Sequence, residues 1–237
     1  METKEVGFGI NGLYQYELFG QKLWITTTHV CLFIIILTII ILAIVANRVI
    51  KKADPLKPPG HFQNIVETLV ESVDGLTRSN MGVKHGLKFS NYIGTLLLFI
   101  FLSNISGLFG LRPPTADYGT TLALGVMTFI LIHYNGFKYQ KLGHLTGLFK
   151  PLILAPINII GELATPISLS LRLFGNIMSG TVMLGLIYGL LPKFILLIWP
   201  AALHAYFDVF SGAIQTYVFC MLTMVFIANQ FDGEETA

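Results

Sequence analysis

The chain has 237 residues, of which 54% are hydrophobic and only 12% are charged, and its mean hydropathy is +0.70. An ordinary soluble domain carries about 25% charged residues, so this composition excludes that class and indicates a membrane protein. The formal net charge of +2 is too small to indicate a nucleic-acid-binding protein, and the isolated Cys31 and Cys220 predict neither a disulfide framework nor a metal site.

The N-terminal part is predicted to hold a polar segment followed by the first membrane helix. Residues 1–22 are polar and mixed in charge, whereas residues 23–46 contain no charged residue. About 20 apolar residues suffice for a helix to cross the hydrocarbon core. Because this apolar block is too long for the core of a signal peptide, we expect an uncleaved membrane helix over 23–46.

Residues 47–90 are predicted to form a basic loop that contains one amphipathic helix. The stretch ADPLKPPG, residues 53–60, is too rich in proline for a helix to cross. From 61 to 80, apolar residues recur at helical spacing opposite an acidic face. We expect this helix to lie on the cytoplasmic membrane surface or to pack on a partner protein.

Residues 91–137 are predicted to form a membrane hairpin, because 91–111 and 118–137 are uncharged blocks of spanning length. Most basic residues lie in 47–90 and in the following loop, 138–150. Since cytoplasmic loops carry an excess of lysine and arginine, we expect both loops and the tail 232–237 in the cytoplasm and the N-terminus outside.

The last third, residues 151–231, is predicted to be a hairpin of two unusually long helices. Residues 151–191 are interrupted only by Glu162 and Arg172, and residues 194–231 only by Asp208. As a single helix each block would be about 60 Å long, twice the hydrocarbon thickness of about 30 Å. Each block therefore either breaks or tilts strongly. The expected fold is an all-α polytopic membrane protein with about five membrane helices and one amphipathic helix.

Polar residues form one stripe along each of these two long helices. Between 160 and 190, polar side chains share one face at steps of 3, 4, 4 and 3, namely Thr165, Ser168, Arg172, Asn176 and Ser179. The last block repeats the pattern at steps of 4, 3 and 4 with His204, Asp208, Ser211 and Gln215. Two antiparallel helices can bring such stripes onto a common surface.

Arg172 indicates a functional site, because a guanidinium is costly in hydrocarbon and cannot escape that cost by losing its proton. The residue types alone also allow Arg172 and Asp208 to form a structural ion pair that fixes the hairpin. On that reading His204 is a packing histidine, and Glu162 reaches toward cytoplasmic water.

Three segments closely resemble subunit a of bacterial F-type ATP synthases: SLSLRLFGNIMSG (168–180), FSGAIQTYVF (210–219) and PPTADYGTTLALGVM (113–127). The resemblance implies a stator subunit of a bacterial plasma membrane, packed against a rotating ring of c subunits with the b subunits of the peripheral stalk and the rest of the complex nearby. It implies two offset half-channels for protons or sodium ions and two tilted final helices. The family's essential arginine matches Arg172, and its asparagine and glutamine match Asn176 and Gln215.

The sequence departs from many relatives at two positions of the expected ion path. Thr181 and Asn158 stand where many relatives carry ionisable residues, so we expect Asp208 to serve the outer half-channel and Glu162 the inner one. The full set of path candidates besides Arg172 is Asp208, Gln215, Asn176, Glu162, Ser168, Ser179, Ser211, His204, Thr181 and Asn158. No GxxxxGK[ST] motif is present, so no nucleotide cofactor is expected and the ATP chemistry is expected in partner subunits.

Two other functions are compatible with an intramembrane arginine. A stand-alone secondary transporter could use Arg172 to bind an anionic substrate, but it would predict inverted repeats, and the sequence has no convincing one. A purely structural subunit of a membrane complex would use both polar stripes as assembly surfaces.

Overall fold

A computed structural model describes residues 12–18, 21–52, 60–141, 143, 155–190 and 199–231. The proline-rich linker except Gly60, most of the loop 138–150, the LLPK turn after Leu190 and the tail 232–237 lie outside the described residues.

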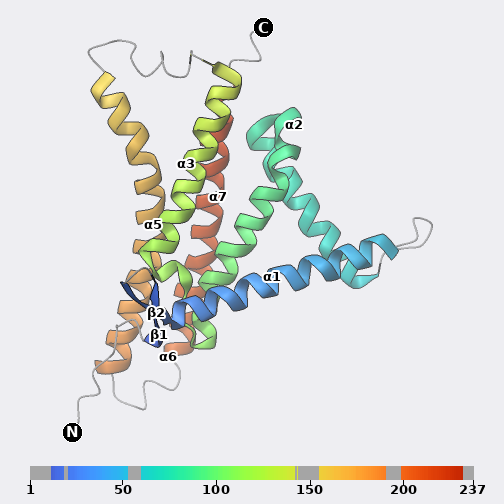
Figure 1. Ribbon diagram of the computed structural model, residues 1–237. Helices are drawn as coiled ribbons and strands as arrows, with labels where there is room; N and C mark the ends of the chain where they lie inside the picture. The colour runs from blue at the N-terminus through green and yellow to red at the C-terminus, as the bar shows by residue number, and fades with distance from the viewer. Residues whose placement is uncertain are drawn as a thin grey trace.

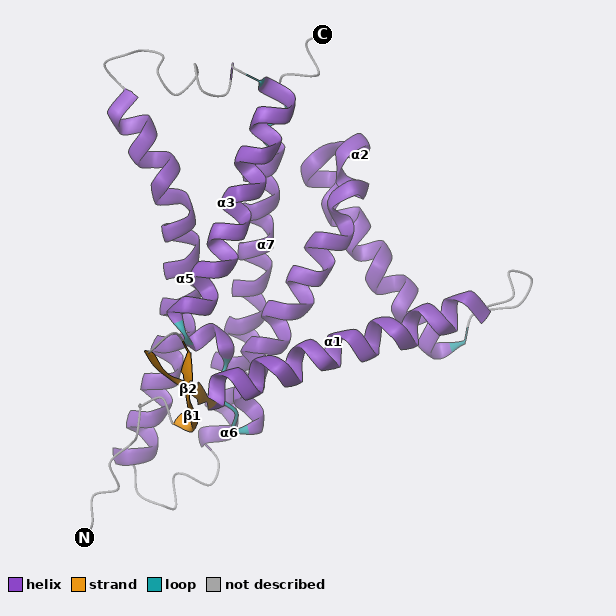
Figure 2. Cartoon of the chain, viewed as in Figure 1, coloured by secondary structure: helices purple, strands orange, loops and turns teal. Residues whose placement is uncertain are grey.

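Within the described part of the chain, five helical stretches are long and apolar enough to cross a membrane. They are α1 (Thr27–Lys52), α2 (His61–Ile105), α3 (Tyr118–Gln140), α5 (Ala155–Leu190), and a last stretch made of α6 (Trp199–His204), the π-helical η5 (Ala205–Ser211) and α7 (Gly212–Ala228). Two short 3-10 turns, η1 (Ser106–Phe109) and η2 (Pro114–Ala116), connect α2 to α3. The expected all-α polytopic architecture is confirmed (Figures 1 and 2).

The N-terminal segment contains a β-hairpin that hydropathy did not predict. Strand β1 (Gly12–Leu18) pairs antiparallel with β2 (Gln21–Thr26), so residues 23–26 belong to a strand and the first helix begins at Thr27. The alternating Tyr14, Tyr16 and Leu18 carry the period-two signal of a strand.

Helix α2 turns back at Gly82, so its two halves form a V-shaped hairpin (Figure 1). Gly82 has φ 74°, a left-handed conformation that glycine adopts without a steric penalty. The Ser90 hydroxyl donates a hydrogen bond to Asp74 across the reversal. The predicted amphipathic helix 61–80 therefore packs in part on the next segment of its own chain, and residues 83–90 are helical where a loop was expected.

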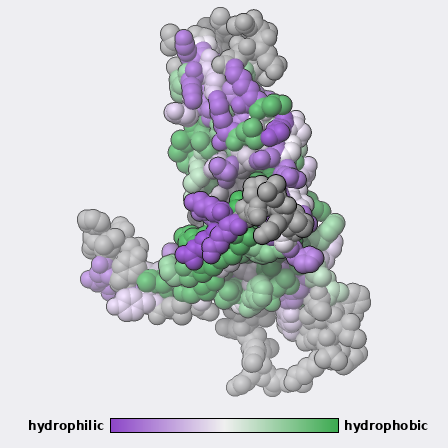
Figure 3. Space-filling model, turned by 90° about the vertical axis from the view of Figure 1, so that its right-hand side faces the viewer, coloured by the Kyte–Doolittle hydropathy of each residue, from purple (hydrophilic) through white to green (hydrophobic). Residues whose placement is uncertain are grey.

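The core lies where the second half of α2, α3, α5 and α7 meet. Ile93 and Ile100 of α2, Leu173 of α5, and Phe219 and Met224 of α7 are among its fully buried side chains. By contrast, α1 runs across the other helices and exposes most of its apolar surface (Figure 1). Hydrophobic side chains gather across the lower part of the molecule in the space-filling view (Figure 3), so this surface needs lipid or a partner protein to cover it.

The two long C-terminal stretches do not break into separate membrane segments. Helix α5 continues through Pro166, and the last stretch passes through the π-helical turn without a described loop. Close packing supports α5 at the proline: a Cβ on Gly125 of α3 would lie 2.6 Å from the Pro166 carbonyl oxygen. Hydropathy left open whether each long block breaks or tilts strongly. The structure shows unbroken helices, and their tilt in a membrane stays a prediction.

Candidate functional site

Arg172 lies near the middle of α5, and its side chain is exposed. It forms no hydrogen bond or ion pair with any residue that the structure describes, whereas Asp208 is bound to His204. The structural Arg172–Asp208 ion pair is therefore not formed. Ser168 and Ser179 of the polar stripe are exposed on the same face, and the exposed apolar Leu171 lies beside them. A permanently charged group thus projects from a mixed polar and apolar helix face toward whatever covers that face.

On one side of Arg172, a groove runs between α5 and α7 toward the N-terminal end of α5. A hollow of about 190 Å³ next to Arg172 is lined by Thr165, Ser168 and Phe226, among others. A second hollow of about 640 Å³ shares Thr165 and Phe226 with the first and reaches Asn158 and Glu162. Because they share lining residues, the two hollows lie next to each other along the groove between Glu162 and Arg172.

A histidine that the sequence did not single out lies next to Glu162. His133 of α3 places its Nε2 atom 3.9 Å from a carboxylate oxygen of Glu162. Both side chains are partly exposed. The sequence showed His133 only as a single histidine within a predicted membrane helix. The pairing with a residue of another helix became visible only in the fold.

On the other side of Arg172, the two predicted polar stripes meet. The Asn176 side-chain amide donates a hydrogen bond of 3.0 Å to the Ser211 hydroxyl. Ser179 and Thr181 instead donate to carbonyl oxygens of their own helix, those of Asn176 and Ile177, each at 2.9 Å. The structure thus brings Asn176 and Ser211 together and leaves Ser179 and Thr181 on exposed positions of α5.

Asp208 precedes Ser211 by one turn in the π-helical segment and lies farther from Arg172. Its carboxylate accepts a 2.6 Å hydrogen bond from His204 Nδ1 and packs against Gly107 of η1, where an added Cβ would lie 3.1 Å from the carboxylate. The Tyr188 hydroxyl, from the end of α5, lies 2.9 Å from His204 Nε2. The insertion that makes a π-helical turn is frequent at functional sites and here turns Asp208 toward η1.

Next to Asp208, a buried polar cluster joins α2, η2 and α7. The Asn104 amide donates to the Gly212 carbonyl at 3.0 Å and accepts from the Thr115 hydroxyl at 2.8 Å. Gln215, one turn along α7, is only 7% exposed, and its amide nitrogen has no hydrogen-bond partner among the described residues. A buried amide nitrogen without a hydrogen-bond partner costs free energy.

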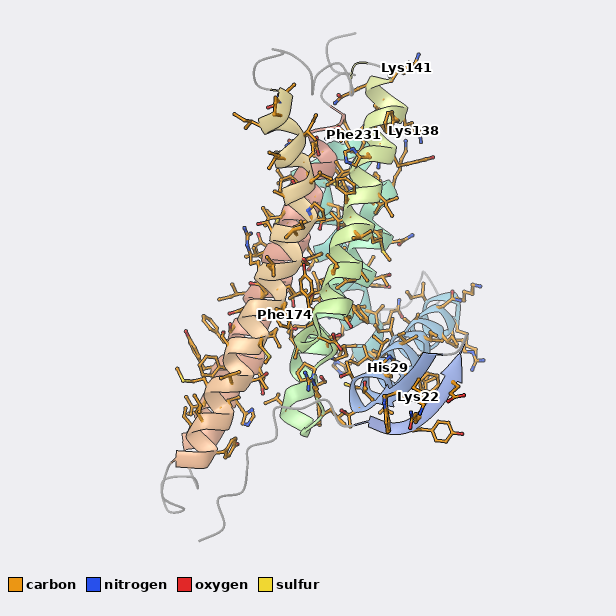
Figure 4. All side chains as sticks on the ribbon, turned by 60° about the vertical axis from the view of Figure 1, so that its left-hand side comes forward. Lys22, His29, Lys138, Lys141, Phe174 and Phe231 are labelled. Carbon is orange, nitrogen blue, oxygen red and sulfur yellow. The ribbon has the colours of Figure 1, made fainter. Side chains whose placement is uncertain are left out.

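The polar groups therefore diverge from Arg172 toward opposite ends of α5. Glu162 lies at the end where α3 carries Lys138 and Lys141, and Tyr188 lies toward the end that holds the β-hairpin with Lys22 (Figure 4). Among the described residues, no three His, Cys, Asp or Glu side chains come together as a metal site would require. The arrangement suits the transfer of a small ion along polar groups, with a fixed positive charge between the two arrays.

The family model described as ATP synthase A chain matches residues 29–228. "ATP synthase subunit a, sodium ion specific" from Propionigenium modestum is 39% identical over 195 residues, which cover 75% of this chain and 66% of that relative. "ATP synthase subunit a" of Lysinibacillus sphaericus is 35% identical over 88% of this chain and 92% of its own. The protein of the same name from Staphylococcus saprophyticus is 33% identical over 92% of this chain and 96% of its own.

Proposed function

Because the chain belongs to the family of ATP synthase A chains, we propose that it forms two offset ion half-channels beside a ring of c subunits, with Arg172 between them. The protein is a stator subunit of the ion-translocating part of an F-type ATP synthase. A stand-alone transporter is not favoured, since relatives that match over nearly their whole length are subunits of that complex.

One observation carries the proposal: Arg172 is exposed, has no partner among the described residues and lies where two polar arrays meet. The groove from Glu162 supplies one half, and the array through Asn176, Ser211 and Asp208 supplies the other. Gln215, with its unpaired amide, is proposed to contact the same moving partner or its ion.

Arg172 is proposed to act as a gate that carries no proton itself. A cation within about 4–6 Å of a c-subunit carboxyl lowers that group's pKa by about 1–3, equivalent to roughly 1.4–4 kcal/mol in favour of the ionised form. One charge crossing a membrane potential of 100 mV gains about 2.3 kcal/mol, a comparable energy. A single fixed arginine is therefore strong enough to decide where the rotor releases its ion, and it repels a cation that would leak between the half-channels.

The basic residues support an orientation for the two halves. The Glu162 end of the groove lies beside Lys138 and Lys141, which the positive-inside rule places in the cytoplasm (Figure 4). The Asp208 half then opens to the outside, where the β-hairpin and the N-terminus also lie. We assign the protein to a bacterial plasma membrane.

The exposed apolar surfaces support the choice of partners. The face of α5 that carries Arg172 also exposes Met183 and Leu186, three and four turns further along the helix, which suits a ring of apolar c-subunit helices. The apolar surface of α1 is available to lipid or to the b subunits of the peripheral stalk. ATP chemistry is assigned to other subunits of the complex, and this chain is proposed to be non-catalytic.

Replacing Arg172 by alanine in the reconstituted complex tests the gate. We expect ATP synthesis to be lost in an assembled complex, while passive ion leak stays equal or increases. Arg48→Ala removes an equally charged, exposed residue at the other end of the chain and should leave synthesis unchanged. Synthesis near the wild-type rate in the assembled Arg172→Ala complex would contradict the gate.

A further inference from the structure

Among the described residues, no hydrogen bond links Thr181 to Asp208. The Thr181 hydroxyl donates to the carbonyl oxygen of Ile177 on its own helix and lies on an exposed face. Asp208, the carboxylate proposed for the outer half-channel, has a side chain that is only 15% exposed. The outer half-channel needs further groups that lead from the surface to this carboxylate.

We propose that Tyr188, His204 and Asp208 form a proton-conducting chain in the outer half-channel, with Tyr188 at its mouth. This inference rests on the proposed function and adds Tyr188, which no sequence pattern had singled out. The two hydrogen bonds, 2.9 Å from the tyrosine hydroxyl to His204 Nε2 and 2.6 Å from His204 Nδ1 to Asp208, join the three residues in series.

The exposure of the three residues falls in the order that such a chain requires. Tyr188 is 45% exposed, and the side chains of His204 and Asp208 are 26% and 15% exposed. Tyr188 therefore contacts the surroundings while Asp208 does so least. From Asp208, the next polar groups toward Arg172 are Ser211 and its hydrogen-bond partner Asn176.

Each transfer moves one proton and exchanges one O–H or N–H bond for another. The Tyr188 hydroxyl gives its proton to His204 Nε2 and takes one from a hydronium ion outside, which leaves water, and His204 Nδ1 gives its proton to the Asp208 carboxylate. Before the next transfer the imidazole reorients, so that an N–H again faces Asp208 and a bare nitrogen faces Tyr188. Neutral histidine has one donor and one acceptor nitrogen, so it can accept at one and release at the other. Protonated Asp208 then delivers the proton inward and returns to the carboxylate. No oxidant, reductant or cofactor takes part.

The surrounding backbone fixes this geometry. The π-helical turn holds His204 and Asp208 on one side of the helix, and the bare Gly107 leaves room for the carboxylate. Phe207 packs onto Gly180 of α5, where an added Cβ would lie 3.3 Å from its ring. This contact keeps the π-helical segment close to the helix that carries Tyr188.

The chain also favours H⁺ over Na⁺ in this half-channel. A proton can pass through an imidazole by exchange between its two nitrogens, whereas a metal ion needs an open, water-sized path and oxygen ligands. The similarity to a sodium-ion-specific relative therefore does not by itself extend to the ion carried here.

The test uses the whole complex in sealed vesicles and compares Tyr188→Phe with Tyr206→Phe. Both changes remove one hydroxyl from an exposed tyrosine of the same region, and the Tyr206 ring packs on Phe207 and Phe210 without a hydrogen bond to any described residue. ATP synthesis driven by an imposed proton gradient at low Na⁺ should fall in Tyr188→Phe and not in Tyr206→Phe. The residual rate should show a larger solvent deuterium isotope effect.

His204→Ala provides a second readout. Its synthesis rate should fall by about a hundredfold, the low end for loss of a positioned proton-transfer group, and should recover in part when free imidazole is added outside. A histidine with a purely structural role would not be rescued in this way. If the His204→Ala complex does not assemble, the tyrosine comparison decides alone.

The proposal is overturned if Tyr188→Phe matches Tyr206→Phe, or if imidazole fails to rescue an assembled His204→Ala complex. Arg172→Ala in the same vesicles separates this failure from that of the proposed function. Loss of synthesis in Arg172→Ala alone would retain the gate and reject the Tyr188–His204–Asp208 chain. Normal synthesis in Arg172→Ala would reject the gate itself.

Discussion

Replacing Asn104 by alanine is expected to loosen the contact between α2 and α7 next to the outer half of the ion path. Asn104 is 1% exposed, donates to the Gly212 carbonyl at 3.0 Å and accepts from the Thr115 hydroxyl at 2.8 Å. Alanine keeps the Cβ that packs on Gly212 but removes both hydrogen bonds.

The expected loss of stability follows mainly from these two bonds, because a third, from the Asn104 amide to the Thr216 hydroxyl, is longer at 3.3 Å. A hydrogen bond between membrane helices contributes about 0.6–2 kcal/mol, so losing two costs about 1–4 kcal/mol. The Gly212 carbonyl keeps a 2.7 Å hydrogen bond from the Thr216 hydroxyl, which limits the cost of losing the bond from Asn104. The buried Thr115 hydroxyl, in contrast, loses its acceptor. We therefore expect the lower half of that range.

Cys220 reports this change directly, because its thiol lies buried on α7. The purified complex is heated with a thiol reagent, and the labelling of Cys220 is followed by mass spectrometry. Asn104→Ala should lower the labelling midpoint by several degrees, while Asn91→Ala, the same change at an exposed position of α2, should not. Equal midpoints for the two variants would refute the stabilising role of the Asn104 cluster.

Three further predictions concern the helix contacts and the inner groove. Gly125→Leu should prevent assembly, because even its Cβ would meet the Pro166 carbonyl oxygen at 2.6 Å, and normal amounts of complex in the membrane would contradict this. Asn176→Ala should weaken the α5–η5 contact by about 0.6–2 kcal/mol and slow ATP synthesis, with Ser211→Ala giving a similar loss of thermal stability if the bond is the cause. Glu162→Gln should slow ATP-driven ion pumping without affecting assembly, and an unchanged pumping rate would exclude Glu162 from the path.

Much of the fold could be predicted because a membrane helix is visible in the sequence as an uninterrupted apolar stretch of about 20 residues. The polar stripe centred on Arg172 could also be predicted, since steps of three and four place residues on one helix face. The reversal at Gly82 could not be predicted, because a glycine between two helical patterns is equally compatible with a sharp turn and with a loop. The β-hairpin was missed because its alternation is short and lies beside a strong hydropathy signal.

The parts of the site that were missed depend on partners distant in sequence. Tyr188 and His133 belong to no polar periodicity of their helices, and their roles appear only when His204 and Glu162 are brought beside them. Asn104 likewise becomes significant through Gly212, which lies more than one hundred residues later. Periodicity reports which face of a helix a residue occupies and contains no information on which helix covers that face.

We predict an ion path that is divided at Arg172. The most direct test measures from which side of the membrane a water-soluble reagent reaches each half. Single cysteines are introduced at Ser168 and at Tyr188 in a complex whose Cys31 and Cys220 are replaced by serine, and a membrane-impermeant thiol reagent is applied from one side at a time. We expect the cysteine at 168 to react only from the cytoplasmic side and the cysteine at 188 only from the outside. Reaction of both positions from the same side would contradict two half-channels that meet at Arg172.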